Sequence, residues 1–89
     1  MPKFYFHVDH GELHADFEGV EFECEQQARE AAVKTCGQAV KEIAQEFWEK
    51  GEWRMHVTDD EHRLLFTLRV ASAVPSGDVR FTPRPIAPV

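Results

Sequence analysis

The chain has 89 residues, of which 43% are hydrophobic, and this suits one small domain with a thin packed core rather than a disordered chain. Its formal net charge of −6 disfavours binding to nucleic acids and to anionic membrane surfaces, because both require a basic protein surface. We therefore expect neither a nucleic acid nor a membrane as a partner.

Residues 1–3 lead directly into a segment with the pattern of a β-strand. They contain no apolar segment of the kind found in signal peptides, and no later run is long enough to span a bilayer. We therefore expect a cytoplasmic protein.

Residues 3–17 are predicted to form a β-hairpin, because apolar and polar side chains alternate along them with a period of two. A two-residue turn at His10-Gly11 would place His7 opposite His14. In this register one face carries the apolar residues Phe4, Phe6, Val8, Leu13, Ala15 and Phe17. The opposite face carries Tyr5, His7, Asp9, Glu12, His14 and Asp16.

Residues 18–23 form either a short extra strand or an extended lead-in to a helix. Residues 25–49 are predicted to form one helix, ended by Gly51, because apolar residues recur at spacings of three and four. This stripe consists of Ala28, Ala32, Cys36, Ala39, Val40, Ile43 and Phe47, which we expect to face the core.

Residues 53–70 are predicted to form a second hairpin with a turn at residues 59–62. Pairing Thr58 with Arg63 places Val57 opposite Leu64, Met55 opposite Phe66 and Trp53 opposite Leu68, so that one face is again apolar. Of the two tryptophans beside Gly51, we expect one to pack under the helix end and allow the other to be exposed.

These elements predict an α+β fold, with a four-stranded antiparallel sheet of ββαββ order and the helix packed on one face. The domain covers residues 1–70. Residues 71–89 form a proline-rich tail that we expect to be disordered or extended, because prolines interrupt helices and central strands.

The sheet face away from the helix is the predicted partner-binding surface. Its candidate residues are Tyr5, His7, His14, Arg54, His56, Arg63, Leu65 and Arg69. Acidic residues of the first hairpin and basic residues of the second could make this face self-complementary in a two-fold dimer. An ordinary solvated face with weak charge pairs is the alternative.

His7 and His14 are the candidate metal ligands, with Asp9 as a neighbouring carboxylate. In the predicted register their Cβ atoms lie about 5 Å apart, close enough to share Zn²⁺ or Ni²⁺. The spacing matches no recognised zinc pattern, so a polar sheet face is the other interpretation. No catalytic motif, phosphate-binding loop or cofactor motif is present, and we expect no cofactor and no enzymatic activity.

The chain resembles a family of short bacterial proteins known only as a domain of unknown function. The resemblance covers residues 2–70 and is carried by Pro2–Val8 with the Tyr-Phe-His-Val segment, Gly11, Asp16-Phe17-Glu18-Gly19-Val20-Glu21, Ala28–Ala31 and Val57–Glu61. It implies that His7, Asp16, Glu18 and Gly19 are family features, with Asp16 and Glu18 fixing a turn. The family commonly has Asp at the helix start, where this chain has Cys24.

We expect a non-enzymatic protein-interaction or regulatory module that uses the open sheet face or a sheet edge. Its expected partner is a second copy of itself, as a homodimer, or another protein. The alternative is a metal- or small-ligand-responsive protein that uses the His7/His14 cluster.

Overall fold

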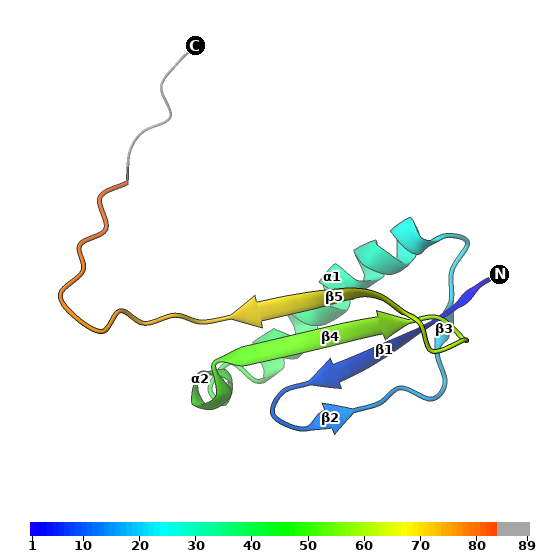
Figure 1. Ribbon diagram of the computed structural model, residues 1–89, viewed down its shortest axis with the longest axis horizontal. Helices are drawn as coiled ribbons and strands as arrows, with labels where there is room; N and C mark the ends of the chain where they lie inside the picture. The colour runs from blue at the N-terminus through cyan, green and yellow to red at the C-terminus, as the bar shows by residue number, and fades with distance from the viewer. Residues whose placement is uncertain (84–89) are drawn as a thin grey trace, which may run out of the picture.

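The computed structural model describes residues 1–83 and forms one antiparallel sheet with helices on one side (Figure 1). Its elements are β1 (Lys3–Asp9), β2 (Leu13–His14), β3 (Val20–Glu21), α1 (Glu25–Glu42), α2 (Phe47–Lys50), β4 (Glu52–Thr58) and β5 (Leu64–Ala71). The strand order is β2-β1-β4-β5, and β3 pairs with β1. The predicted α+β class is confirmed, with five strands in place of four and with residues 20–21 as a short strand.

The core lies between the sheet and α1. Alternate residues of β4 point into it, and the small residues Ala28, Ala32 and Cys36 of α1 allow the helix to lie close to the strands. The buried residues are Phe4, Ala28, Ala32, Cys36, Phe47, Trp53, Met55 and Val57. The predicted helix stripe is therefore confirmed, and so is the predicted core face of the second hairpin except at Leu64, which is 61% exposed.

The predicted single helix over residues 25–49 is wrong, because α1 ends at Glu42 and α2 begins only at Phe47. The turn between them places Phe47 in the core and leaves Trp48 65% exposed, whereas Trp53 is 2% exposed. Gly51 ends α2 with a φ of 73°, as expected of a residue after a helix. No proline or glycine marks the break, so composition alone did not reveal it.

The predicted register of the first hairpin is wrong by one residue: Val8 faces His14 and Asp9 faces Leu13. The reason is that His10 does not take the positive φ expected of it in the predicted turn. Its side chain instead contacts residues of α2 and β4. Its Nδ1–H donates to the Glu52 carbonyl at 2.9 Å, and its ring stacks on Phe47 with centroids 6.1 Å apart.

The one-residue shift reverses the faces of the returning strand. Leu13 now lies opposite Asp9, on the side of the sheet away from the helix, and His14 shares a side with Val8. β2 is only two residues long, and both of its side chains are exposed. Phe17, predicted to face the core, is 88% exposed.

The second hairpin is longer at its turn than predicted. Val57 pairs with Phe66 and Met55 with Leu68, and a bulge lies next to the Thr58–Leu64 pair. The shift in the body of the strands is two residues, so Phe66 and Leu68 still face the core, as predicted. Leu64 was predicted to face the core too, but it pairs with Thr58 and is exposed. The bulge makes Leu65 the extra residue, and Leu65 packs against the core.

Residues 72–83 contain no helix or strand and lead away from the sheet (Figure 1). The prediction for residues 84–89 lies outside the described residues. Neither helix in the described part of the chain has the length and apolar character needed to cross a bilayer.

Candidate functional site

The open face of the sheet carries two hollows, each with a volume of about 210 Å³. One lies near the β1–β2 turn and α2, and the other lies where β1 begins and β4 ends. We call them the charged hollow and the aromatic hollow, after the side chains that line them.

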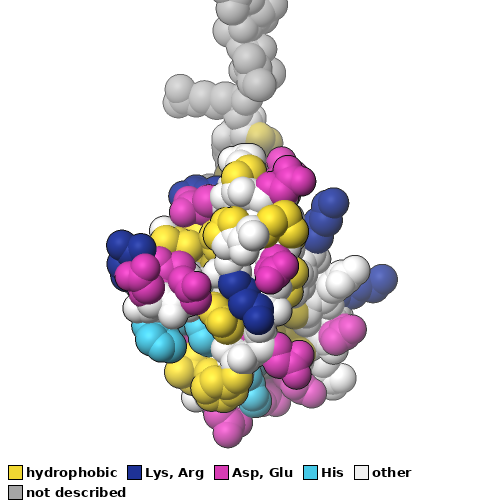
Figure 2. Space-filling model, turned by 90° about the vertical axis from the view of Figure 1, so that its right-hand side faces the viewer, with side chains coloured by type: hydrophobic (Ala, Val, Ile, Leu, Met, Phe, Trp, Pro, Cys, Tyr) yellow, Lys and Arg dark blue, Asp and Glu magenta, His cyan; other side chains and the backbone are white. Residues whose placement is uncertain are grey.

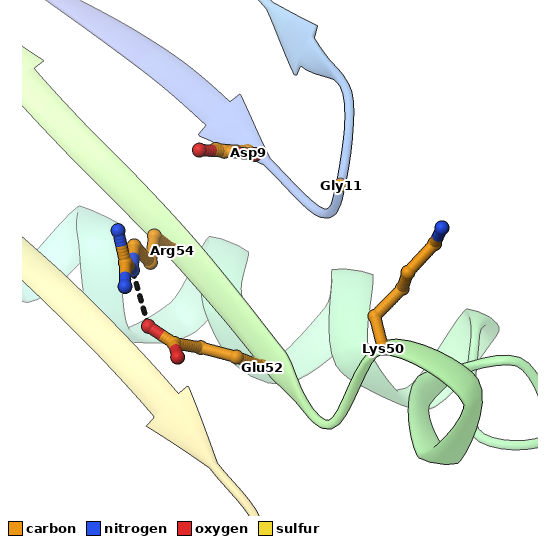
Figure 3. Close-up of a pocket in the computed structure, with 5 residues that line it drawn as sticks. All are labelled: Asp9, Gly11, Lys50, Glu52 and Arg54. Carbon is orange, nitrogen blue, oxygen red and sulfur yellow. Dashed lines mark hydrogen bonds and ion pairs between the residues drawn. The ribbon is translucent and has the colours of Figure 1, made fainter.

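The charged hollow is lined by Asp9, Gly11, Lys50, Glu52 and Arg54 (Figure 3). Its central charges are paired with one another: Arg54 hydrogen-bonds with Glu52, and the Arg69 Nε lies 3.9 Å from the same carboxylate. The hydrogen bond from Arg54 and the two nearby guanidinium charges lower the pKa of Glu52. The aliphatic part of Lys50 lies against Gly11, where a Cβ atom would come within 2.8 Å of it. This hollow therefore satisfies most of its own charge.

Asp16 closes a gap in the outer edge of the sheet. Alternate residues of a strand direct their backbone N–H groups to the same edge. The N–H groups of Phe4, Phe6 and Val8 therefore all point away from β4. β3 pairs with Phe4 and β2 pairs with Val8, but no strand reaches Phe6. The Asp16 carboxylate accepts the Phe6 N–H instead, at 3.1 Å.

The same carboxylate organises the turn that follows it. Its other oxygen accepts the N–H groups of Glu18 at 3.0 Å and Gly19 at 3.1 Å. Gly19 has a φ of 72°, and a Cβ atom there would lie 2.9 Å from the Tyr5 ring. The expectation that Asp16 fixes a turn is thus confirmed, and the turn positions Tyr5 as well.

His7 is held in place by two hydrogen bonds, one at each ring nitrogen. Its Nδ1 accepts the Asp16 N–H at 3.0 Å, so Nε2 carries the proton and donates to Thr58 Oγ1, also at 3.0 Å. His7 therefore links β1, the turn and β4, and both of its nitrogens are occupied. It has no lone pair free for a metal ion.

The aromatic hollow surrounds His7 and is lined by Tyr5, His7, Asp16, Phe17, Thr58, Asp60 and His62. Figure 2 looks onto the end of the molecule that carries the β4–β5 turn. Histidine and hydrophobic side chains lie next to one another there, below a group of basic (Lys or Arg) and acidic side chains. Sequence reasoning identified Tyr5 and His7 but missed Phe17, Thr58, Asp60 and His62, because the turns that bring them together were predicted with the wrong lengths.

The other predicted partner-binding residues are spread over the molecule. Arg54 and Arg69 face each other on β4 and β5, and His56 Nδ1 lies 2.9 Å from Thr67 Oγ1. Arg63 pairs with Asp59 in the β4–β5 turn at 2.9 Å. Leu65 packs against the core, so its predicted place on the open face is wrong.

The predicted metal cluster of His7, His14 and Asp9 is wrong in its geometry. The observed register places His14 on the other side of the sheet from His7. Within residues 1–83 no group of three or more His, Cys, Asp or Glu side chains is arranged to hold a metal ion.

The two long edges of the sheet differ in how far their backbone groups are covered by other parts of the chain. The edge of β1 is covered by β2, Asp16 and β3, whereas in the described part of the chain no strand pairs with the outer side of β5. β5 is the longest strand, with eight residues, and contains no proline and only one charged residue, Arg69. Protein edge strands are usually shortened, charged or covered, because a bare edge pairs with other chains.

The ionisation of Asp16 predicts a loss of stability in acid. Burial acts to raise its pKa, but the N–H groups of Gly19, Phe6 and Glu18 together lower it below the ordinary value. A carboxyl group with a lowered pKa in the folded state stabilises the fold above its unfolded pKa of about 3.9, and this contribution is lost as the pH falls through the folded value. We expect the free energy of unfolding, measured with urea between about pH 6 and about pH 3, to fall more for the wild type than for Asp16→Asn. An equal fall in both proteins would refute this role.

The fold and its surface define a small α+β domain with one helical layer on an antiparallel sheet. The chain belongs to the DUF6894 family, a domain of unknown function whose family model matches residues 3–71. The match ends at the last residue of β5 and so includes every strand and helix described above. No curated protein and no solved structure matches the chain.

Proposed function

We propose that this protein is a non-enzymatic interaction module that associates through the free edge of β5, and that its partner is a second copy of itself. The observation that carries the proposal is the difference between the two edges of the sheet. Strand addition at a bare edge supplies backbone hydrogen bonds to the unpaired N–H and C=O groups of β5.

The side chains of β5 support pairing of two copies about a two-fold axis. Residues opposite each other in an antiparallel pair share a face, so Phe66, Leu68 and Val70 would meet their counterparts on the helix side of the joined sheet. These three residues are only half-buried in the single chain. Association would bury more of their apolar surface, which is favourable.

Charge also permits this arrangement. Two pairing registers between the copies are centred closest to the middle of β5 and place side chains of the same sheet face opposite each other. In one, Thr67 faces Thr67 of the second copy, and in the other it faces Arg69. Neither register places the two Arg69 side chains opposite each other.

Replacing Thr67 with lysine tests this proposal. In either register the new lysines would face each other or Arg69, and like charges opposite each other in a sheet cost up to about 1 kcal/mol per pair. The first register makes one such contact and the second makes two, so we expect the dissociation constant of the dimer to rise about five- to tenfold. Thr67→Val, which keeps the shape without the charge, is the matched control and should leave the dimer intact.

Sedimentation equilibrium over a wide range of protein concentration measures these constants. We expect the wild type and Thr67→Val to approach the mass of two chains at high concentration, and Thr67→Lys to lag behind them. A wild-type chain that stays at the mass of one chain throughout would overturn the proposal, as would equal behaviour of the two variants.

A further inference from the structure

The aromatic hollow has an unusual balance of charge. Two carboxylates line it, from Asp16 and Asp60, but no lysine or arginine does. Neither carboxylate takes part in an ion pair among the described residues, whereas the neighbouring Asp59 and Glu61 are both shared by Arg63. Two histidines, His7 and His62, also line it, and both ring nitrogens of His7 are already hydrogen-bonded, to the Asp16 N–H and to Thr58 Oγ1.

Two aromatic rings, those of Tyr5 and Phe17, form another part of its wall. Tyr5 is fixed against the backbone of Gly19, and Phe17 stands beside it with most of its surface exposed. The faces of such rings carry partial negative charge and attract cations. An exposed phenylalanine next to carboxylates gains both contact area and this attraction when a cation with an apolar stem is bound.

The polar groups that remain available also favour a hydrogen-bond donor as ligand. Thr58 Oγ1 accepts one bond from His7 and has a second lone pair, and no described group bonds to the Tyr5 hydroxyl or to the Asp60 carboxylate. Ionised carboxylates only accept hydrogen bonds. The charged hollow on the same face differs, because its arginine and its glutamate already satisfy each other.

From this cavity, its rings and its unmatched negative charge, we propose that the aromatic hollow is a binding site for an organic cation, namely a guanidinium or alkylammonium group on a short aliphatic stem. Such a group is carried by free amines and by arginine or lysine side chains. The site lies on the β1–β4 part of the open face, so this proposal does not depend on dimer formation through β5.

Titration of the full chain with butylguanidinium, followed by the amide resonances of residues lining the hollow, tests the site. Butylurea is the matched neutral probe, because it has nearly the same shape without the charge. We expect saturable shifts with butylguanidinium and none with butylurea. Equal shifts with both probes, or none with either, would overturn the proposal.

Two substitutions locate the site. Asp60→Asn removes one of the two charges, and we expect it to weaken binding about fivefold, as for an exposed charge pair. Glu42→Gln removes a carboxylate charge at an exposed position outside the hollow and should have no effect. Phe17→Leu keeps an apolar side chain but removes the ring, and should weaken binding about threefold. Both lining positions are exposed, and circular dichroism verifies that the variants fold. Equal affinity of Asp60→Asn and Glu42→Gln would refute the location.

One further substitution tests whether the chain itself supplies the cation. Arg80 lies in the described part of the tail. If its side chain fills the hollow, Arg80→Gln should raise the affinity for butylguanidinium. Unchanged affinity excludes Arg80 as the occupant and leaves a cation from outside the chain.

Discussion

Replacing Asp16 with alanine is expected to lower the free energy of unfolding by about 3 kcal/mol, because one carboxylate holds three backbone N–H groups and each bond to a charged group is worth about 1.5–3 kcal/mol when well shielded. The expected loss lies below the sum of three such bonds, because Asp16 is only half-buried and solvent screens its charge. The change leaves the Phe6 N–H without a partner and frees the turn before β3. Urea denaturation measures the effect.

Asp16→Asn is the graded comparison. Its amide oxygen can still accept bonds from Glu18 and Gly19, but its amide nitrogen cannot accept the Phe6 N–H. We expect a loss between those of wild type and Asp16→Ala, and no loss for Asp78→Ala on the exposed tail. A loss below about 1 kcal/mol for Asp16→Ala would show that the edge of β1 does not need this bridge.

Replacing Trp53 with alanine is expected to cost about 3–5 kcal/mol, as for other fully buried aromatic residues. Trp53 lies at the start of β4 between the sheet and the helical layer, where its removal leaves a cavity that the surrounding side chains cannot fill. In a chain this short, such a loss is a large part of the total stability.

Trp48→Ala is the matched control, since it removes the same side chain from an exposed position five residues earlier. We expect it to change the stability by less than about 1 kcal/mol. Thermal unfolding of both variants compares them directly. Equal destabilisation by the two changes would mean that the burial of these tryptophans is assigned wrongly.

The periodic parts of the fold could be predicted from the sequence. β1, β4 and α1 contact the core along one face, so burial itself imposes the alternation of Trp53, Met55 and Val57 and the spacing of Ala28, Ala32 and Cys36. These patterns need no knowledge of what each element packs against. They therefore gave the α+β class and the open face.

The registers could not be predicted in the same way, because contacts distant in sequence decide them. His10 is removed from the turn by a carbonyl group 42 residues later in the chain and by the Phe47 ring. The bulge near Leu65 likewise depends on a turn in which His62 takes a φ of 65° and Asp59 accepts the N–H groups of Glu61 and Arg63. Neither effect leaves a periodic signal.

The candidate sites show the same contrast between local sequence patterns, which could be predicted, and contacts distant in sequence, which could not. The segment Asp16-x-Glu18-Gly19 could be recognised as a turn, but its second task, closing the edge beside Phe6, depends on the three-dimensional position of β1. Phe17 was assigned to the core because it fits an alternating pattern, yet the strand that would continue that pattern stops at His14. Asp16 and Phe17, which follow this early stop, are two of the residues that line the aromatic hollow.

Amide hydrogen exchange, resolved by residue at low and at high protein concentration, tests the proposed use of the β5 edge most directly. If two copies associate there, alternate amides of Leu64–Ala71 gain protection as concentration rises, while those of β2 and β3 do not change. Protection of β5 that is independent of concentration would contradict association at this edge, as would a concentration-dependent gain confined to β2 and β3.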